Sequence, residues 1–278
     1  MILSFHRVSQ CCSRITTEEY SSSFSSAIRL LHKDLRKPIY NIYGLVRFAD
    51  EIVDTFHDYD KAALLQQFRQ ETFEALQRGI SLNPILHSFQ ITINEYKIDH
   101  TLVHAFFDSM EKDLHRQWYD VAGYNEYIYG SAEVVGLMCL YIFCEGDTEM
   151  YAKLKPAAQA LGAAFQKVNF LRDVKADFQG LNRMYFPGVD FMNFTPRMKQ
   201  EIEAEIAGDF KRALPGLLQL PLKARFGVYV AYKYYLSLFN RIRKVAPARI
   251  MKERVRIPSY RKAMIVMHAG VKNQLNLI

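Results

Sequence analysis

The sequence NFLRDVKADFQGLNRMY, residues 169–185, ends an alanine-rich apolar segment with two carboxylates, Asp173 and Asp177. Residues four apart lie on one face of a helix, so the two side chains point the same way, and Asn169 and Gln166 continue that face. Two like charges at this spacing destabilise an isolated helix by roughly 0.2–0.5 kcal/mol. The pair therefore indicates that a cation binds there.

A second stretch, residues 43–54, has the same arrangement. Tyr43, Arg47, Asp50 and Asp54 occur at helical spacing and share one face. A single pair of this kind is most often a solvated helix face. Two pairs, each beside an arginine and each within an apolar helix, are rarer because charged side chains seldom cluster in apolar surroundings. The sequence therefore predicts two acidic helix faces, facing each other at the mouth of one pocket.

The chemistry of these side chains favours magnesium, with manganese as the alternative. Oxygen ligands without histidine or cysteine at metal-binding spacing suit an ion that keeps water ligands and binds substrate phosphates. Arginines beside the carboxylates can hold the remaining anionic oxygens in a bidentate fork. A diphosphate is therefore the expected ligand, and once held in this way it becomes a good leaving group.

Four motifs resemble those of the squalene and phytoene synthase family, most closely those of bacterial phytoene synthases. RFADEIVD, residues 47–54, resembles the first aspartate-rich motif of the family, and residues 169–187 resemble the second. YIYGSAEVVGLM, residues 127–138, resembles its glycine-containing helix, and SSSF, residues 21–24, its N-terminal serine segment. The motifs stand in the family order over nearly the whole chain.

The resemblance implies roles for the matching residues. The implied catalytic residues are Asp50, Asp54, Asp173, Asp177, Tyr127 and Tyr185. The implied metal ligands are Asp50, Asp54, Asn169, Asp173 and Asp177. The residues implied to bind the substrate diphosphates are Ser21, Phe24, Arg47, Asn169, Arg172, Arg183 and Arg261. Two positions depart from the family: Glu133 replaces a glycine, and Arg249 replaces a tyrosine.

Small residues on the apolar segment 124–143 leave one side of it without large side chains. This allows either close approach of another helix or space for a ligand tail, and the two diphosphate sites favour the second. The residues predicted to line the cavity are Gly130, Ala132, Gly136 and Gln166.

The chain shows no long alternation of apolar and polar residues and no hairpin signal, so it is predicted to be all-α, with one domain over residues 1–278. The resemblance implies the isoprenoid synthase fold, a helical bundle around a deep central cavity. Helices are expected at residues 17–32, 38–56, 61–78, 84–96, 100–119, 124–143, 151–175, 196–214 and 220–245.

Composition and charge restrict partners and location. The net charge of +7 and pI near 9.1 indicate attraction to diphosphates, acidic lipids or nucleic acid, and no nucleic-acid-binding module is recognisable.

The longest apolar run, residues 134–143, is about half a membrane span, so no span is expected. The cysteines form no CxxC pair and the N-terminus lacks the apolar segment of a signal peptide, which predicts a cytoplasmic protein. A lipid-dissolved substrate would place it peripherally on the inner face of the membrane. No oligomeric state is predicted.

The resemblance implies a reaction in which two geranylgeranyl diphosphates condense head to head, through prephytoene diphosphate, to give phytoene and two diphosphates. One alternative is a C30 synthase that makes dehydrosqualene or squalene from farnesyl diphosphate. The other is a noncatalytic, membrane-associated member of the family, although such relatives tend to lose the carboxylates.

The first prediction concerns the two acidic faces. Each gathers negative charge that a metal ion, bound together with a substrate phosphate, would neutralise. The variants Asp50→Asn, Asp54→Asn, Asp173→Asn and Asp177→Asn should each lower turnover by about 100-fold or more. Their far-UV circular dichroism should stay that of the wild type. Normal turnover in any two of these variants would contradict the metal-binding role.

Overall fold

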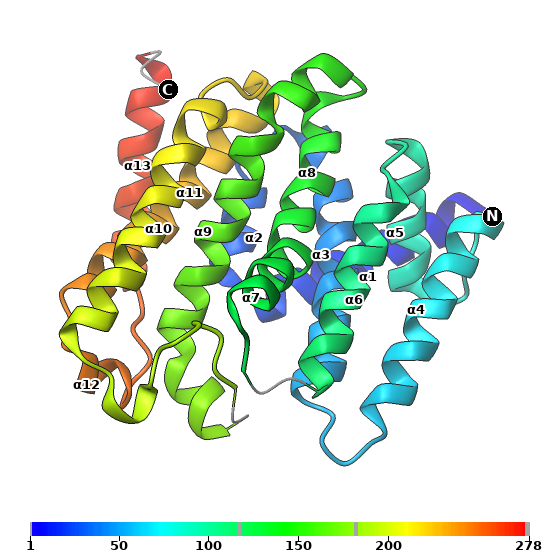
Figure 1. Cartoon of the computed structure of the whole chain (residues 1–278). Coiled ribbons are helices and arrows are strands. Elements are labelled where there is room, and N and C mark those ends of the chain that lie inside the picture. Colours follow the sequence, from blue (N-terminus) through cyan, green and yellow to red (C-terminus); the bar gives the residue numbers. More distant parts are fainter. Residues whose placement is uncertain (1, 116–117, 181–182, 276–278) are drawn as a thin grey trace.

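Helices form nearly all of the regular structure, as Figure 1 shows. The computed structural model describes residues 2–115, 118–180 and 183–275, without the side chains of residues 177–180. Within these residues no strand is present, and the only β-pairing is an isolated bridge between Trp118 and Met184. The prediction of an all-α chain is confirmed.

The helices follow one another along the chain with short connections. Their bounds are α1 (Ile2–Tyr20), α2 (Ser22–Ile28), α3 (Lys33–Asp54), α4 (Lys61–Arg78), α5 (Pro84–Glu95), α6 (His100–His115), α7 (Val121–Ile128), the π-helix η1 (Tyr129–Glu133), α8 (Val134–Cys144), α9 (Thr148–Gly180), the 3-10 helix η2 (Phe191–Asn193), α10 (Pro196–Leu217), α11 (Leu222–Arg243), α12 (Pro247–Ile250) and α13 (Ser259–Gln274).

Side-chain caps set several helix starts. Asp60 accepts a hydrogen bond from the backbone of Ala63 at the start of α4. Asn83 caps α5 and Thr195 caps α10, each followed by a proline at the first helical position. Such caps satisfy amide groups that have no partner within the helix, and proline is tolerated there because its missing N–H would be unpaired anyway.

The N-terminal helix begins earlier than the sequence pattern predicts. A helix start at Thr17 was expected, yet α1 begins at Ile2, and the Thr17 hydroxyl donates to the carbonyl of Ser13 at 2.9 Å inside the helix. The face of α1 that packs against α3 and α5 is polar, so hydrophobic periodicity could not reveal it. Its buried residues are Ser9, Ser13 and Thr17. A Cβ at Gly44 would lie 2.6 Å from Ser13 Oγ, so this contact is close.

One long apolar helix runs through the middle of the molecule. α7, η1 and α8 are continuous over Val121–Cys144, and by length and composition alone this segment could cross a membrane. No such segment was expected from the sequence. More than half of it is buried, in contact with α3, α6 and α9, as is typical of a core helix.

The core has two parts, which meet at a cavity. One cluster of buried apolar side chains includes Phe170, Tyr185 and Leu217, and the other includes Ile39, Phe106 and Leu137. In Figure 1 the helices α4, α5 and α6 lie on the side of the N-terminus, and α10, α11 and α13 lie on the side of the C-terminus. The cavity between the clusters agrees with the fold that the resemblance implied.

Gly130 serves close helix packing, which corrects its prediction as a cavity residue. A Cβ at Gly130 would lie 2.5 Å from the carbonyl oxygen of Ala105 and 2.7 Å from Cβ of Ser109, both on α6. Gly136, by contrast, lines the cavity, and a Cβ there would lie 3.1 Å from the carbonyl oxygen of Ala158. Small residues on this helix therefore have both of the functions considered above.

The packing of Gly130 generates the second prediction. Gly130→Ala should lower the free energy of unfolding by about 1–3 kcal/mol, because the added methyl group would meet backbone atoms of α6. The matched control is Gly270→Ala on α13, where a Cβ would meet nothing within 4 Å. The control should be neutral or slightly stabilising, since alanine favours helix. Equal denaturation midpoints for the two variants would contradict this packing.

Candidate active site

A cavity of about 510 Å³ lies between the two core clusters. Its polar end reaches the surface, since the Asp54 side chain is 44% exposed and that of Arg254 is 50% exposed. The polar lining residues include Tyr43, Arg47, Asp50, Asp54, Asp113, Asn169, Arg172, Asp173 and Arg254. The remainder is mostly apolar. A charged ligand head and an apolar tail would both fit such a cavity.

The first acidic face projects from α3 into the cavity because the opposite face of that helix, including Leu45 and Ala49, is buried in the core. Burial, together with the neighbouring charge of Asp54, raises the pKa of Asp50 to about 8. Arg47 forms an ion pair with Glu51 and lies over the ring of Tyr20, 4.2 Å from its centroid. Asp50 therefore forms no ion pair within 4 Å among the described contacts, although the charge of Arg47 limits the rise of its pKa.

The second acidic face belongs to α9, and there two arginines hold Asp173. Arg172 Nε donates to Asp173 Oδ1 at 2.9 Å, and Arg254 Nε lies 2.6 Å from the same oxygen. One turn earlier, Asn169 Oδ1 is buried without a hydrogen-bond partner among the described residues. α9 continues past Asp177, but the side chain of Asp177 lies outside the described part, so its predicted role stays a prediction.

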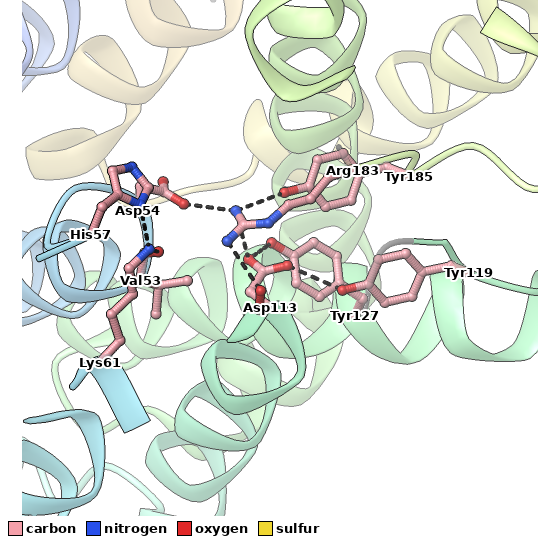
Figure 2. A network of polar contacts seen from close by, with 9 residues as sticks. All are labelled: Val53, Asp54, His57, Lys61, Asp113, Tyr119, Tyr127, Arg183 and Tyr185. Carbon is pink, nitrogen blue, oxygen red and sulfur yellow. Dashed lines mark hydrogen bonds and ion pairs between the residues drawn. The ribbon is translucent and has the colours of Figure 1, made fainter. Parts of the chain in front are cut away.

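A buried polar network joins the first acidic face to α6, as Figure 2 shows. Arg183 Nη1 donates to Asp54 Oδ1 at 2.7 Å, and Arg183 Nη2 donates to the backbone oxygen of Asp113 at 3.0 Å. The hydroxyls of Tyr119 and Tyr127 both donate to the carboxylate of Asp113. Burial raises the pKa of Asp113 to about 6, and the charge of Arg183 limits that rise. Asp113 thus contacts both Arg183 and the cavity-lining Tyr127.

Three stacked aromatic rings line the cavity near this network. The rings of Phe170 and Tyr185 are nearly parallel, with centroids 4.0 Å apart, and those of Tyr127 and Tyr185 are 5.3 Å apart. Burial and the nearby Asp113 carboxylate raise the pKa of Tyr127 well above its ordinary value, so its hydroxyl keeps its proton. Ring faces of this kind attract cations.

The structure brings most of the predicted residues to this one cavity. Those that line it are Ser21, Phe24, Arg47, Asp50, Asp54, Tyr127, Ala132, Gly136, Gln166, Asn169, Arg172, Asp173 and Tyr185. Arg183 is not among the lining residues, but it donates a hydrogen bond to one of them, Asp54. Ser21 also caps α2, its hydroxyl accepting a hydrogen bond from the amide of Phe24 at 3.2 Å.

Arg261 is not among the residues that line the cavity, and its predicted contact with a diphosphate stays a prediction. It lies exposed on α13, whereas Arg254, in the segment before α13, reaches the cavity and pairs with Asp173. The motif of basic residues was recognised, but spacing could not show which member points inward, because the turn between α12 and α13 decides it.

The two departures from the family pattern lie away from the cavity lining. Glu133 accepts a hydrogen bond from Gln159 Nε2 on α9 at 2.8 Å, so its side chain is satisfied beside the cavity wall. Arg249 forms an exposed ion pair with Glu253 on the next turn. Neither residue is among those that line the cavity.

Sequence reasoning missed Asp113, although a signal for it exists. Asp113 continues the apolar stripe of α6 formed by Val103, Phe106 and Met110, at spacings of three, four and three. An acidic residue in line with buried positions of a helix is unusual and marks a paired or functional carboxylate.

The polar end offers the donors that magnesium prefers, namely carboxylate oxygens and the unpaired amide oxygen of Asn169. In the described part of the chain no three acidic, histidine or cysteine side chains come together as a metal cluster. Asp50, Asp54, Asp173 and Asn169 can hold metal ions together with substrate oxygens or water. Magnesium often binds in this way.

Comparison with known proteins agrees with this site. A model of the squalene/phytoene synthase family matches residues 17–261. The phytoene synthase of Cereibacter sphaeroides is 27% identical over 264 residues, covering 84% of this chain and 70% of the relative. The 4,4'-diapophytoene synthase of Staphylococcus haemolyticus is 26% identical over 208 residues, covering 72% of this chain and 69% of the relative.

A third relative and two solved structures extend the comparison. The presqualene diphosphate synthase of Rhodopseudomonas palustris is 30% identical over 169 residues, which cover 60% of this chain and 58% of the relative. A ligand-bound dehydrosqualene synthase has a TM-score of 0.84 at 20% identity, over 97% of this chain and 98% of the other. A squalene synthase from Alicyclobacillus acidocaldarius has a TM-score of 0.74 at 20% identity, over 86% and 94%.

The two solved structures show that this chain has the isoprenoid synthase fold. The matched family acts on isoprenoid diphosphates by prenyl transfer. Because the family model covers nearly the whole chain, and the motifs that carry the match surround one cavity, the protein belongs to the squalene/phytoene synthase family.

Proposed function

We propose that the protein is a phytoene synthase, which condenses two geranylgeranyl diphosphates head to head through prephytoene diphosphate and releases both diphosphates. The observation that carries the proposal is the single cavity in which two acidic helix faces, three arginines and a long apolar wall meet. The relative named phytoene synthase, which matches 84% of this chain, supports the choice of product.

Arg47, Arg172 and Arg254 hold the diphosphates at the polar end. All three line the cavity, and a guanidinium can form two parallel hydrogen bonds to phosphate oxygens. Magnesium, when bound by the acidic residues, neutralises the charge that grows on the departing diphosphate. The buried Asp50 carries its proton easily in the absence of a cation, since its pKa is raised to about 8.

The aromatic stack lies where an allylic cation needs protection. Loss of the first diphosphate leaves a carbocation that water would destroy, and the rings of Tyr127, Phe170 and Tyr185 line the cavity there. Their faces can stabilise a passing cation by roughly 0.5–2 kcal/mol each. Asp113 fixes the hydroxyl of Tyr127, which keeps that ring in place.

The apolar wall consists of two sets of helices. One set, between η1, α8, α9 and α10, is rich in small residues, including Ala132, Gly136, Ala157 and Gly216. The other set, from α2, α3, the turn between them and α11, contributes Ile28, Leu31, Ile39 and Val228. Two substrates require space for two tails, and we assign one tail to each set.

A C30 synthase acting on farnesyl diphosphate is the second candidate. The relative named 4,4'-diapophytoene synthase favours it, because it matches with nearly the same identity as the phytoene synthase. A noncatalytic function is disfavoured by the carboxylates of Asp50, Asp54 and Asp173, which all line the cavity.

Tail length generates the third prediction. With magnesium and equal concentrations of both diphosphates, the purified protein should use geranylgeranyl diphosphate in preference to farnesyl diphosphate, since each buried methylene contributes about 0.8 kcal/mol. Ala132→Phe should shift use toward the shorter substrate or abolish turnover, and Ala62→Phe on the exposed face of α4 should change nothing. Mostly C30 hydrocarbon from the wild type would contradict the proposed substrate.

The Asp113 network generates the fourth prediction. Asp113→Asn should lower turnover roughly 10- to 100-fold, because it removes the charge that attracts Arg183 and leaves one acceptor oxygen for the hydroxyls of Tyr119 and Tyr127. The matched control is Asp108→Asn, on the same helix but in a surface ion pair with Arg69. Asp113→Asn should still bind a nonhydrolysable diphosphate analogue.

A pH profile tests the same network separately. The raised pKa of Asp113, about 6, means that its carboxylate is ionised above that pH and is lost as the pH falls through it. Wild-type turnover should therefore fall on the acidic side of about pH 6, and this limb should be absent in Asp113→Asn. An unchanged acidic limb in the variant would show that Asp113 does not control it.

A further inference from the structure

The outer face of α13 carries an apolar stripe. Tyr260, Met264, Met267 and Val271 follow one another at helical spacing, and they are 63%, 57%, 64% and 56% exposed. Leu275 continues the stripe directly after the helix and is 62% exposed. Contiguous exposed apolar side chains of this kind mark an interaction surface.

The inner face of α13 already serves the fold. Ile265, Val266 and Ala269 pack against the core cluster of the C-terminal side, and α13 lies against α11 along one edge of the molecule (Figure 1). The helix is therefore held in place by one apolar face, while the second apolar face is exposed. A fold that needed only an anchoring helix would place polar side chains outside.

The segment that contains the stripe is rich in positive charge. Residues 249–272 contain seven lysines and arginines and a single acidic residue, Glu253. Arg256 and Arg261, on either side of the start of α13, are exposed. On α13 itself Arg261 and Lys272 flank the stripe on one side, and the helix has no acidic residue. An apolar stripe beside basic side chains is typical of a helix that lies in the plane of a membrane interface.

A second copy of this chain is a poor occupant for the same surface. It would bring the same positive charge against the first, and like charges that meet at an interface disfavour association. One face of a 16-residue helix is also small beside the roughly 1,200–2,000 Å² that a stable interface buries. Anionic headgroups match the charge, and acyl chains match the stripe.

We infer that α13 docks the protein on the surface of an anionic lipid bilayer, with its apolar stripe in the interface and its cations on the headgroups. This inference goes beyond the proposed reaction and does not depend on which isoprenoid diphosphate is used.

The position of α13 relative to the cavity connects this surface with entry of the substrate. Arg254, just before α13, lines the cavity, and Lys262 Nζ on α13 donates to Ser22 Oγ at 3.1 Å, next to the cavity-lining Ser21. The start of the docking helix therefore adjoins the polar end of the cavity. A substrate with its diphosphate in the headgroup layer and its tail among acyl chains can pass into the cavity without crossing water.

Vesicle flotation of the full chain, without substrate, tests the inference. One set of vesicles contains phosphatidylcholine alone, and the other contains phosphatidylcholine and phosphatidylglycerol in equal parts. The wild type should float with the anionic vesicles, and Met264→Glu with Met267→Glu should lower the bound fraction by about 10-fold or more. Arg256→Gln with Lys272→Gln should weaken binding and reduce its salt dependence.

The matched control places the same charges on other exposed apolar positions. Leu82 and Met192 are 91% and 77% exposed, so Leu82→Glu with Met192→Glu should bind vesicles like the wild type. All variants should keep the wild-type circular dichroism. If the glutamate pair on α13 does not fold, Met264→Ser with Met267→Ser provides the same comparison.

Three results would overturn the inference. They are a wild type that stays in solution with anionic vesicles, a stripe variant that floats like the control, and a wild-type dimer that the stripe variant dissociates. Because vesicle binding is measured without substrate, failure here leaves the proposed reaction intact. Loss of turnover with normal flotation would instead contradict only the proposed reaction.

Discussion

Arg183 donates to the carboxylate of Asp54 on α3 and to the backbone of Asp113 on α6, while its own segment follows α9. These bonds connect α3, which carries the first acidic face, to the segment that follows α9, the helix that carries the second. A guanidinium suits this position because it stays charged and donates in several directions. Its charge also opposes the rise that burial causes in the pKa of Asp113. The geometry of the polar end of the cavity depends on this one side chain.

Arginines are distributed unequally between the two acidic faces, and this has a chemical consequence. Asp173 is held by Arg172 and Arg254, whereas Asp50 is buried beside Asp54, with its pKa raised to about 8. A buried carboxylate next to a second one is stabilised as an anion only when a cation arrives. Arg183 pairs with Asp54 on the same face, so Asp50 is the carboxylate with the greatest need for a cation among those whose contacts are described.

The same helices provide an apolar interior and a polar opening. α3 and α9 each bury an apolar face in the core and present acidic side chains to the cavity, so the position of the carboxylates is fixed by core packing. The aromatic stack of Tyr127, Phe170 and Tyr185 lies between the two environments. With the proposed docking face beside the opening, a substrate would meet lipid, then charge, then a dry apolar wall.

The sequence by itself determined the helical class and the two acidic faces, because spacing along a helix decides which side chains share a face. The resemblance of four motifs to the family indicated the family and most of the other cavity residues. Only the tertiary structure decided which residues from distant parts of the sequence come into contact. Asp113 meets Arg183 only because α6 packs beside the loop after α9, and Gly130 packs against α6 instead of lining the cavity. The start of α1 and the whole of α13 were missed as well, because α1 buries serines and α13 exposes apolar residues. Only contacts between helices determine which face of a helix is inside.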